Sequence, residues 1–169
     1  MKPHFLATVL LGSLPIFANA VVPREVINSC LKTESTQAVR YVEIILTSFT
    51  TEEDEDSKRN ATTVNYGRHK YGVWESTNSD EFGLVYDSAT IPASKIARIG
   101  SEAPAPFDPY TAQWGEARHG KQSYLCITFN FQGLGQSGSF QNVRGTYAIE
   151  SRKAPKFYFA MGDIRKLKN

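Results

Sequence analysis

The chain has 169 residues, of which 41% are hydrophobic and 21% are charged, and its formal net charge is +2. This length fits one domain with one core, and the apolar content excludes a disordered chain. The small net charge argues against a dedicated nucleic-acid-binding protein, and no apolar run reaches the roughly 18 residues that a membrane-spanning helix needs.

The first twenty residues are predicted to be a signal peptide. Lys2 begins a short polar start, Phe5–Phe17 is mostly apolar, and Ala18-Asn19-Ala20 supplies the small residues that a signal peptidase accepts. Its short length and its ending are typical of bacterial export signals, and a eukaryotic secretory origin stays open. We therefore expect residues 21–169 to form a single exported β-rich domain in a periplasmic or extracellular compartment.

The chain contains two cysteines, Cys30 and Cys126. In an oxidising compartment an even cysteine count predicts a disulfide, and two cysteines allow one intramolecular pairing. Bonded cysteines cannot ligate zinc, and the few histidines cannot replace them, so no metal is expected.

The mature chain begins with a predicted helix over 22–32, whose apolar face holds Val26, Ile27, Cys30 and Leu31 at helical spacing. From Val39 to Phe49 the period changes to two, which predicts a strand. Apolar residues fall on both sides of this strand, so we expect it to be central and well covered.

Residues 50–60 are polar and predict an exposed loop that connects a hairpin. Four shorter strands follow at 61–66, 69–74, 82–86 and 94–99, with a break at Gly67 between the first two. Three prolines in 103–109 predict an irregular loop.

The strongest predicted strand is Ser123–Phe131, with Leu125, Ile127 and Phe129 on one face. A glycine-rich loop at 132–142 and two strands at 143–151 and 156–167 complete the chain. Short strands separated by turn signals predict a mainly β fold, an antiparallel β-sandwich or barrel-like sheet with one short N-terminal helix and one disulfide.

The most distinctive surface feature is an acidic run, and the candidate binding residues in it are Glu52, Glu53, Asp54, Glu55 and Asp56. Such a run is either a solvated loop or an element that steers the protein into a basic cleft. The second interpretation predicts an exported protein that binds another macromolecule, such as an inhibitor or immunity-type protein of the bacterial envelope. The glycine-rich loop, with Gly133, Gly135 and Gly138, is the second candidate binding element.

The same three glycines match the G-x-G-x-x-G pattern of dinucleotide-binding loops. That chemistry requires a helix directly after the glycines, because the free N–H groups of the helix hold the pyrophosphate. Residues 139–149 alternate like a strand instead, so neither a dinucleotide nor any other cofactor is expected.

Two alternatives remain open. A small secreted hydrolase or toxin would use His119 with His69 and a carboxylate, Glu116 or Asp108, as acid and base. A structural envelope component would self-associate through an exposed sheet edge. The sequence contains no convincing catalytic arrangement, so it favours a binding protein over an enzyme.

Overall fold

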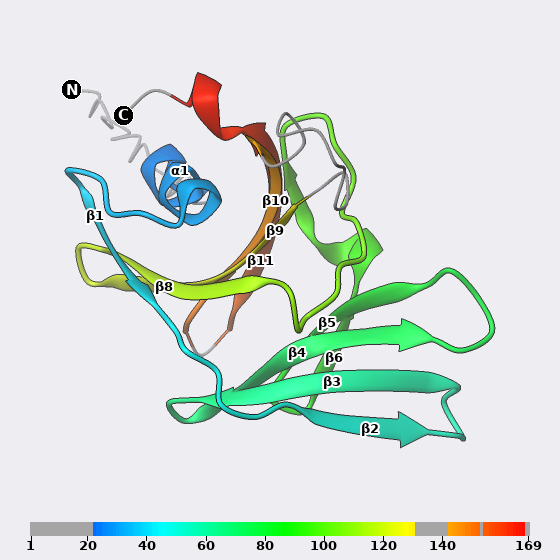
Figure 1. Ribbon diagram of the computed structural model, residues 1–169. Helices are drawn as coiled ribbons and strands as arrows, with labels where there is room; N and C mark the ends of the chain where they lie inside the picture. Colours follow the sequence, from blue (N-terminus) through cyan, green and yellow to red (C-terminus); the bar gives the residue numbers. More distant parts are fainter. Residues whose placement is uncertain (1–21, 131–141, 153, 168–169) are drawn as a thin grey trace, which may run out of the picture.

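The computed structural model describes residues 22–130, 142–152 and 154–167 (Figure 1). The predicted signal peptide at 1–20 lies outside the described residues. The candidate binding residues Gly133, Gly135 and Gly138 also lie outside the described residues.

The predicted N-terminal helix is present as α1, Arg24–Lys32. Pro23 occupies the N-cap, and Thr33 ends the helix in the left-handed conformation. Val26, Ile27, Cys30 and Leu31 are buried, which confirms the predicted face. Within the described ranges, no helix has the length and apolarity to cross a membrane.

The strands form two sheets. The first sheet has the order β1 (Val39–Glu43), β8 (Gln113–His119), β9 (Gln122–Asn130), β10 (Val143–Glu150), β11 (Lys156–Asp163) and β7 (Ala97–Ile99). The second has the order β2 (Thr50–Asp54), β3 (Arg59–Tyr66), β4 (His69–Ser76), β5 (Phe82–Tyr86) and β6 (Ala89–Pro92). All pairings are antiparallel except that of β11 with β7. Short 3₁₀ turns lie at Ala93–Lys95 and Ile164–Lys166.

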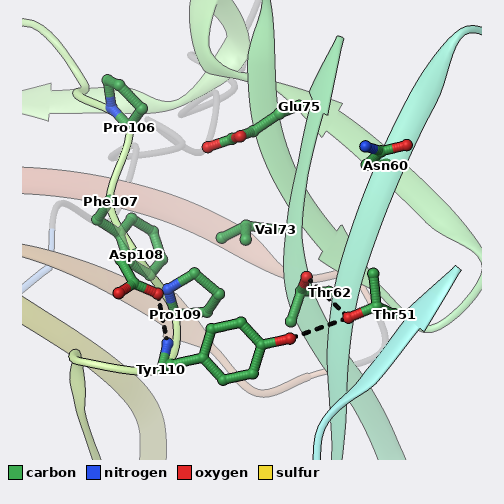
Figure 2. Close-up of a pocket in the computed structure, with 10 residues that line it drawn as sticks. All are labelled: Thr51, Asn60, Thr62, Val73, Glu75, Pro106, Phe107, Asp108, Pro109 and Tyr110. Atoms are coloured by element: carbon green, nitrogen blue, oxygen red, sulfur yellow. Dashed lines mark hydrogen bonds between the residues drawn. The ribbon is translucent and has the colours of Figure 1, made fainter. Parts of the chain in front are cut away.

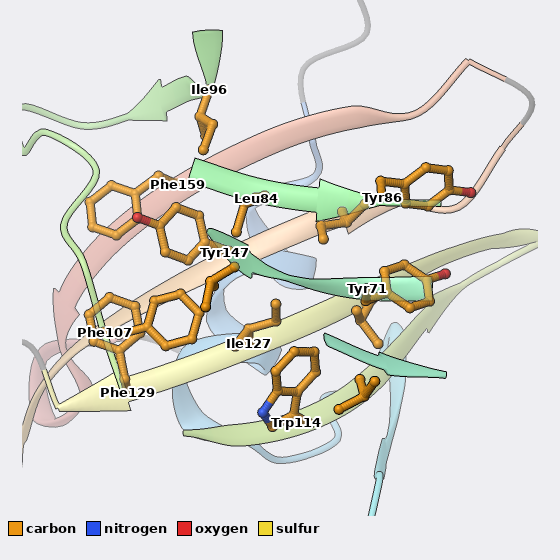
Figure 3. Packing of buried hydrophobic residues seen from close by; sticks show 14 residues of the cluster. Tyr71, Leu84, Tyr86, Ile96, Phe107, Trp114, Ile127, Phe129, Tyr147 and Phe159 are labelled. Atoms are coloured by element: carbon orange, nitrogen blue, oxygen red, sulfur yellow. The ribbon is translucent and has the colours of Figure 1, made fainter. Parts of the chain in front are cut away.

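The main core lies between the two sheets (Figure 3). As predicted, alternate residues of β9 point to opposite sides: Leu125, Ile127 and Phe129 face this core. Phe107 stacks on Phe129 at 4.8 Å between ring centres and closes one end of the core. This packing confirms the antiparallel sandwich, and among the described strands the sheets do not close into a barrel.

A smaller core lies on the other face of the first sheet, beneath α1 (Figure 1). The predicted disulfide joins Cys30 of α1 to Cys126 of β9, and both residues are fully buried. Beside it, the Thr128 hydroxyl donates to the Cys30 carbonyl oxygen at 2.8 Å. The fold is therefore a helix, a six-stranded sheet and a five-stranded sheet in three layers.

The prediction of a central strand at 39–49 is wrong. β1 ends at Glu43 and forms an edge of the first sheet, and Ile45 is 85% exposed. The chain leaves the first sheet here and enters the second at Thr50. The apolar residues on both sides reflect this crossing, because Ile44, Leu46 and Phe49 pack against the main core as the chain passes it.

The acidic run was expected in a loop, but Thr50–Asp54 is strand β2 and only residues 55–58 form the turn. The predicted exposure is confirmed, since every residue from 50 to 58 is exposed. An edge strand with polar side chains on both faces has no alternation in hydropathy, which explains the error. His119, expected in a polar loop, is the last residue of β8, whose small and charged residues also hide the strand pattern.

Candidate functional site

The acidic run begins on β2, an edge strand of the second sheet, and continues into the turn that follows, so its five carboxylates have different surroundings. Glu52 pairs with Lys70 at 3.3 Å on the outer face of the sheet. Asp54 caps the turn, and its Oδ1 accepts the N–H groups of residues 56 and 57, each at 3.1 Å. The Ser57 hydroxyl and these N–H groups lower the pKa of Asp54. Glu53, Glu55 and Asp56 form no ion pair with any described residue.

The connection between β4 and β5 adds further acids at the same end of the sheet. The N–H of Thr77 donates to the carbonyl oxygen of Lys58 at 2.9 Å, which holds the two turns together. Residues 52–59 contain five acidic and two basic residues, and residues 75–81 contain three acidic and no basic ones. The guanidinium of Arg59 lies over the Trp74 ring, 4.3 Å from its centre. We call these two segments the acidic end.

A pocket of about 570 Å³ opens on the inner face of the second sheet beside the acidic end (Figure 2). We call it the Tyr110 pocket. Its strand wall comes from β2, β3 and β4, and its other wall is the segment that precedes β8. The lining residues are Thr51, Asn60, Thr62, Val73, Glu75, Pro106, Phe107, Asp108, Pro109 and Tyr110. Two of them are carboxylates, and the lining includes no cationic side chain.

The second wall is held in place by hydrogen bonds at its base. The Asp108 Oδ1 accepts the N–H of Tyr110 at 2.9 Å, and the Trp114 indole N–H donates to the Pro109 carbonyl oxygen at 3.2 Å. Tyr110 is 60% exposed, but its hydroxyl lies 3.0 Å from the Thr51 hydroxyl and its ring lies 4.8 Å from that of Phe49. An exposed aromatic ring is thus fixed in one orientation at the mouth of the pocket.

A second cavity, of about 360 Å³, lies between the sheets at the opposite end and contains His69. Glu116 is its central carboxylate and accepts hydrogen bonds from Tyr66 at 3.1 Å, from Arg118 at 2.7 Å and from the Ser123 hydroxyl. Burial raises the pKa of Glu116, but these three donors outweigh burial and hold it below the usual value. Glu116 is therefore already paired with donors from the protein itself.

His69 is also fully engaged. Its Nδ1 lies 3.0 Å from an Asp87 carboxylate oxygen, its Nε2 accepts from the Arg68 Nε at 3.3 Å, and its ring stacks on Tyr86. His119 does not line this cavity. Alternation along β8 places it on the same side as Ala117, which packs beneath α1, whereas Glu116 faces the cavity. His69, on β4 of the second sheet, and His119, on β8 of the first sheet, therefore lie on opposite sides of the first sheet.

The structure thus separates the residues that the sequence proposed together. Glu116 lies near His69, whereas Asp108 lies in the Tyr110 pocket, whose lining includes Thr51 but none of the five carboxylates of the acidic run. Sequence reasoning missed Glu75 and Tyr110; the one signal that marked the region was the proline-rich loop before Tyr110. No group of three His, Cys, Asp or Glu residues able to hold a metal occurs in the part of the chain that the structure describes.

Comparison of the chain with models of protein families, with curated proteins and with solved structures found no match.

Proposed function

We propose that this chain is an exported binding protein that recognises another macromolecule through the acidic end and the open edge of β2. The observation that carries the proposal is that the open edge of β2 and the acidic end lie next to one another. β2 pairs only with β3 among the described strands, so backbone groups remain free along its other side. Its side chains and the adjoining turns carry the largest local excess of negative charge described above.

The negative charge of this surface indicates the kind of partner that it would bind. A concentration of carboxylates attracts a basic surface over a distance and raises the association rate, and the attraction weakens as salt is added. The partner we propose is a protein with a basic cleft. This chain would then act as an inhibitor or immunity-type protein of the bacterial envelope. The buried disulfide supports export, because such bonds persist in oxidising compartments.

The same charge disfavours the structural alternative at this edge. Two copies that paired through β2 would bring like charges opposite one another, which destabilises a strand pair. The hydrolase alternative required both histidines in one cleft, and His69 and His119 face opposite sides of the first sheet. Binding to a different macromolecule is therefore the function that this geometry supports best.

The test begins with capture of the partner by the oxidised protein from extracts and secretions of its own source, with identification by mass spectrometry. Association kinetics are then measured for E53Q/E55Q/D56N, which removes three carboxylates that form no ion pair with the described residues. The matched control E34Q/E43Q/E102Q removes three exposed carboxylates elsewhere. We expect the first variant to associate about tenfold more slowly at low salt and with a flatter salt dependence, and the control to change little. Equal effects of the two variants would refute the proposed surface.

A further inference from the structure

We propose that the Tyr110 pocket binds the guanidinium group of an arginine on an extended basic segment of the partner, and that this segment pairs with β2 as an added strand. The inference rests on the proposed function and specifies which chemical group of the partner would occupy the pocket.

The strand wall of the pocket belongs to two rows of side chains that cross the strands. The register gives the rows Glu53–Asn60–Glu75 and Thr51–Thr62–Val73, and all of these residues except Glu53 line the pocket. Residues opposite one another in paired strands share a face, and neighbouring strands lie about 4.8 Å apart. A strand added to the free edge of β2 would extend both rows by one position. An inward-facing side chain on it would lie beside Glu53 or Thr51, at the entrance to the pocket.

The charges in the pocket favour a cation. Glu75 projects from the strand wall toward the opposite segment, which carries Asp108 (Figure 2). Neither carboxylate forms an ion pair with any residue that the structure describes. Asp108 uses Oδ1 for the N–H of Tyr110, so its Oδ2 is free of that bond. A partner cation beside either carboxylate would therefore gain a charge-assisted hydrogen bond without breaking an ion pair to a described residue.

The remaining lining favours arginine over lysine. A guanidinium is planar, has five N–H donors in a fixed arrangement and stacks on aromatic rings, whereas an ammonium is a compact, strongly hydrated charge. The ring of Tyr110 is exposed and already fixed by Thr51 and Phe49, so it offers a flat face without further ordering. Asn60 adds a side-chain carbonyl that can accept a further N–H, and the pocket volume lies in the range of small-ligand sites.

The test uses a seven-residue peptide that alternates threonine and arginine, so that its arginines share one face of an extended strand. Its binding to the oxidised protein is measured by calorimetry, and the site is located by amide NMR shifts at Thr51, Asn60 and Tyr110. The decisive variant is E75Q/D108N, in which Asn keeps the Oδ1 acceptor for Tyr110. The matched control E55Q/D56N removes two exposed charges of the acidic end outside the pocket.

We expect E75Q/D108N to weaken peptide binding at least tenfold and E55Q/D56N less than threefold. Equal weakening would show that only net charge matters and would overturn the inference, as would equal affinity for a peptide with lysine in place of arginine. Binding of the neutral sugar maltohexaose, with no binding of the arginine peptide, would assign the pocket to glycans and also overturn it.

The captured partner separates this inference from the proposed function. If E53Q/E55Q/D56N slows association with the partner but E75Q/D108N leaves the affinity unchanged, the arginine pocket is wrong and the binding surface stands. If neither variant has an effect, both proposals are wrong.

Discussion

The disulfide between Cys30 and Cys126 is expected to supply a large part of the stability of this domain. The two cysteines are 96 residues apart in the sequence, so the bond closes a long loop in the unfolded chain. In the chain-entropy treatment, a loop of this length corresponds to about 4.7 kcal/mol at 25 °C. Folded domains are stable by only about 5–15 kcal/mol, so its loss would leave the protein marginal.

The assay is equilibrium unfolding in urea of the oxidised protein, the same protein kept reduced, and C30A/C126A. With a denaturant dependence of about 2 kcal/mol per molar urea, we expect reduction to lower the midpoint by about 2 M. Reduced protein keeps both side chains, whereas the double variant also removes two buried sulfur atoms. Neither of these two samples contains the bond, so the difference between them reports the loss of the buried thiols and not loop closure. A reduced midpoint within 0.5 M of the oxidised one would refute the loop-closure reasoning.

Three further predictions concern other contacts. The three donors lower the folded pKa of Glu116 below its unfolded value of 4.5, so the stability it contributes is complete above about pH 4.5 and is lost as the pH falls through the lower folded pKa. Urea midpoints from pH 2 to 7 should fall further in the wild type than in E116Q, which lacks this contribution and which we expect to be about 1–2 kcal/mol less stable at pH 7. Tyr147→Phe removes the 2.6 Å hydrogen bond to the Ala105 carbonyl oxygen and should cost about 1–2 kcal/mol while speeding hydrogen exchange in 103–109. Gly115→Ala places a methyl group against the Tyr41 ring and should cost about 1–3 kcal/mol in thermal unfolding, and an unchanged midpoint would show that the ring moves freely.

The parts of the fold that could be predicted are those in which one segment carries its own pattern. β9 alternates between two buried sides, and α1 has one apolar face, so both could be recognised without knowledge of their neighbours. The disulfide followed from the count of cysteines. β8 and β2 could not be recognised because neither has an alternating hydropathy pattern. They are strands because they pair with neighbouring strands. In β8, Gly115 is where the Tyr41 ring packs, and that contact depends on a segment about seventy residues earlier.

The candidate site was predictable only in its charged part. The acidic run is contiguous in the sequence. The Tyr110 pocket, in contrast, is lined by residues of three neighbouring strands, β2, β3 and β4, and by the distant segment 106–110. Neither Glu75 nor Asp108 has a distinctive local sequence, and only the folded structure places both in the lining of one pocket. Because Tyr110 is aromatic, its residue type alone would assign it to the core, whereas the structure leaves it exposed.

The two ends of the second sheet differ in what they can offer a partner. At the His69 end, Asp87 accepts from His69, and Glu116 accepts from three donors. A ligand there would have to replace hydrogen bonds that the protein already makes, so its net gain would be small. At the acidic end, Glu53 and Glu75 form no ion pair with any described residue, and each can gain a cationic partner without losing one. The difference in pairing, more than the difference in the number of charges, is the reason that we propose the acidic end as the binding surface.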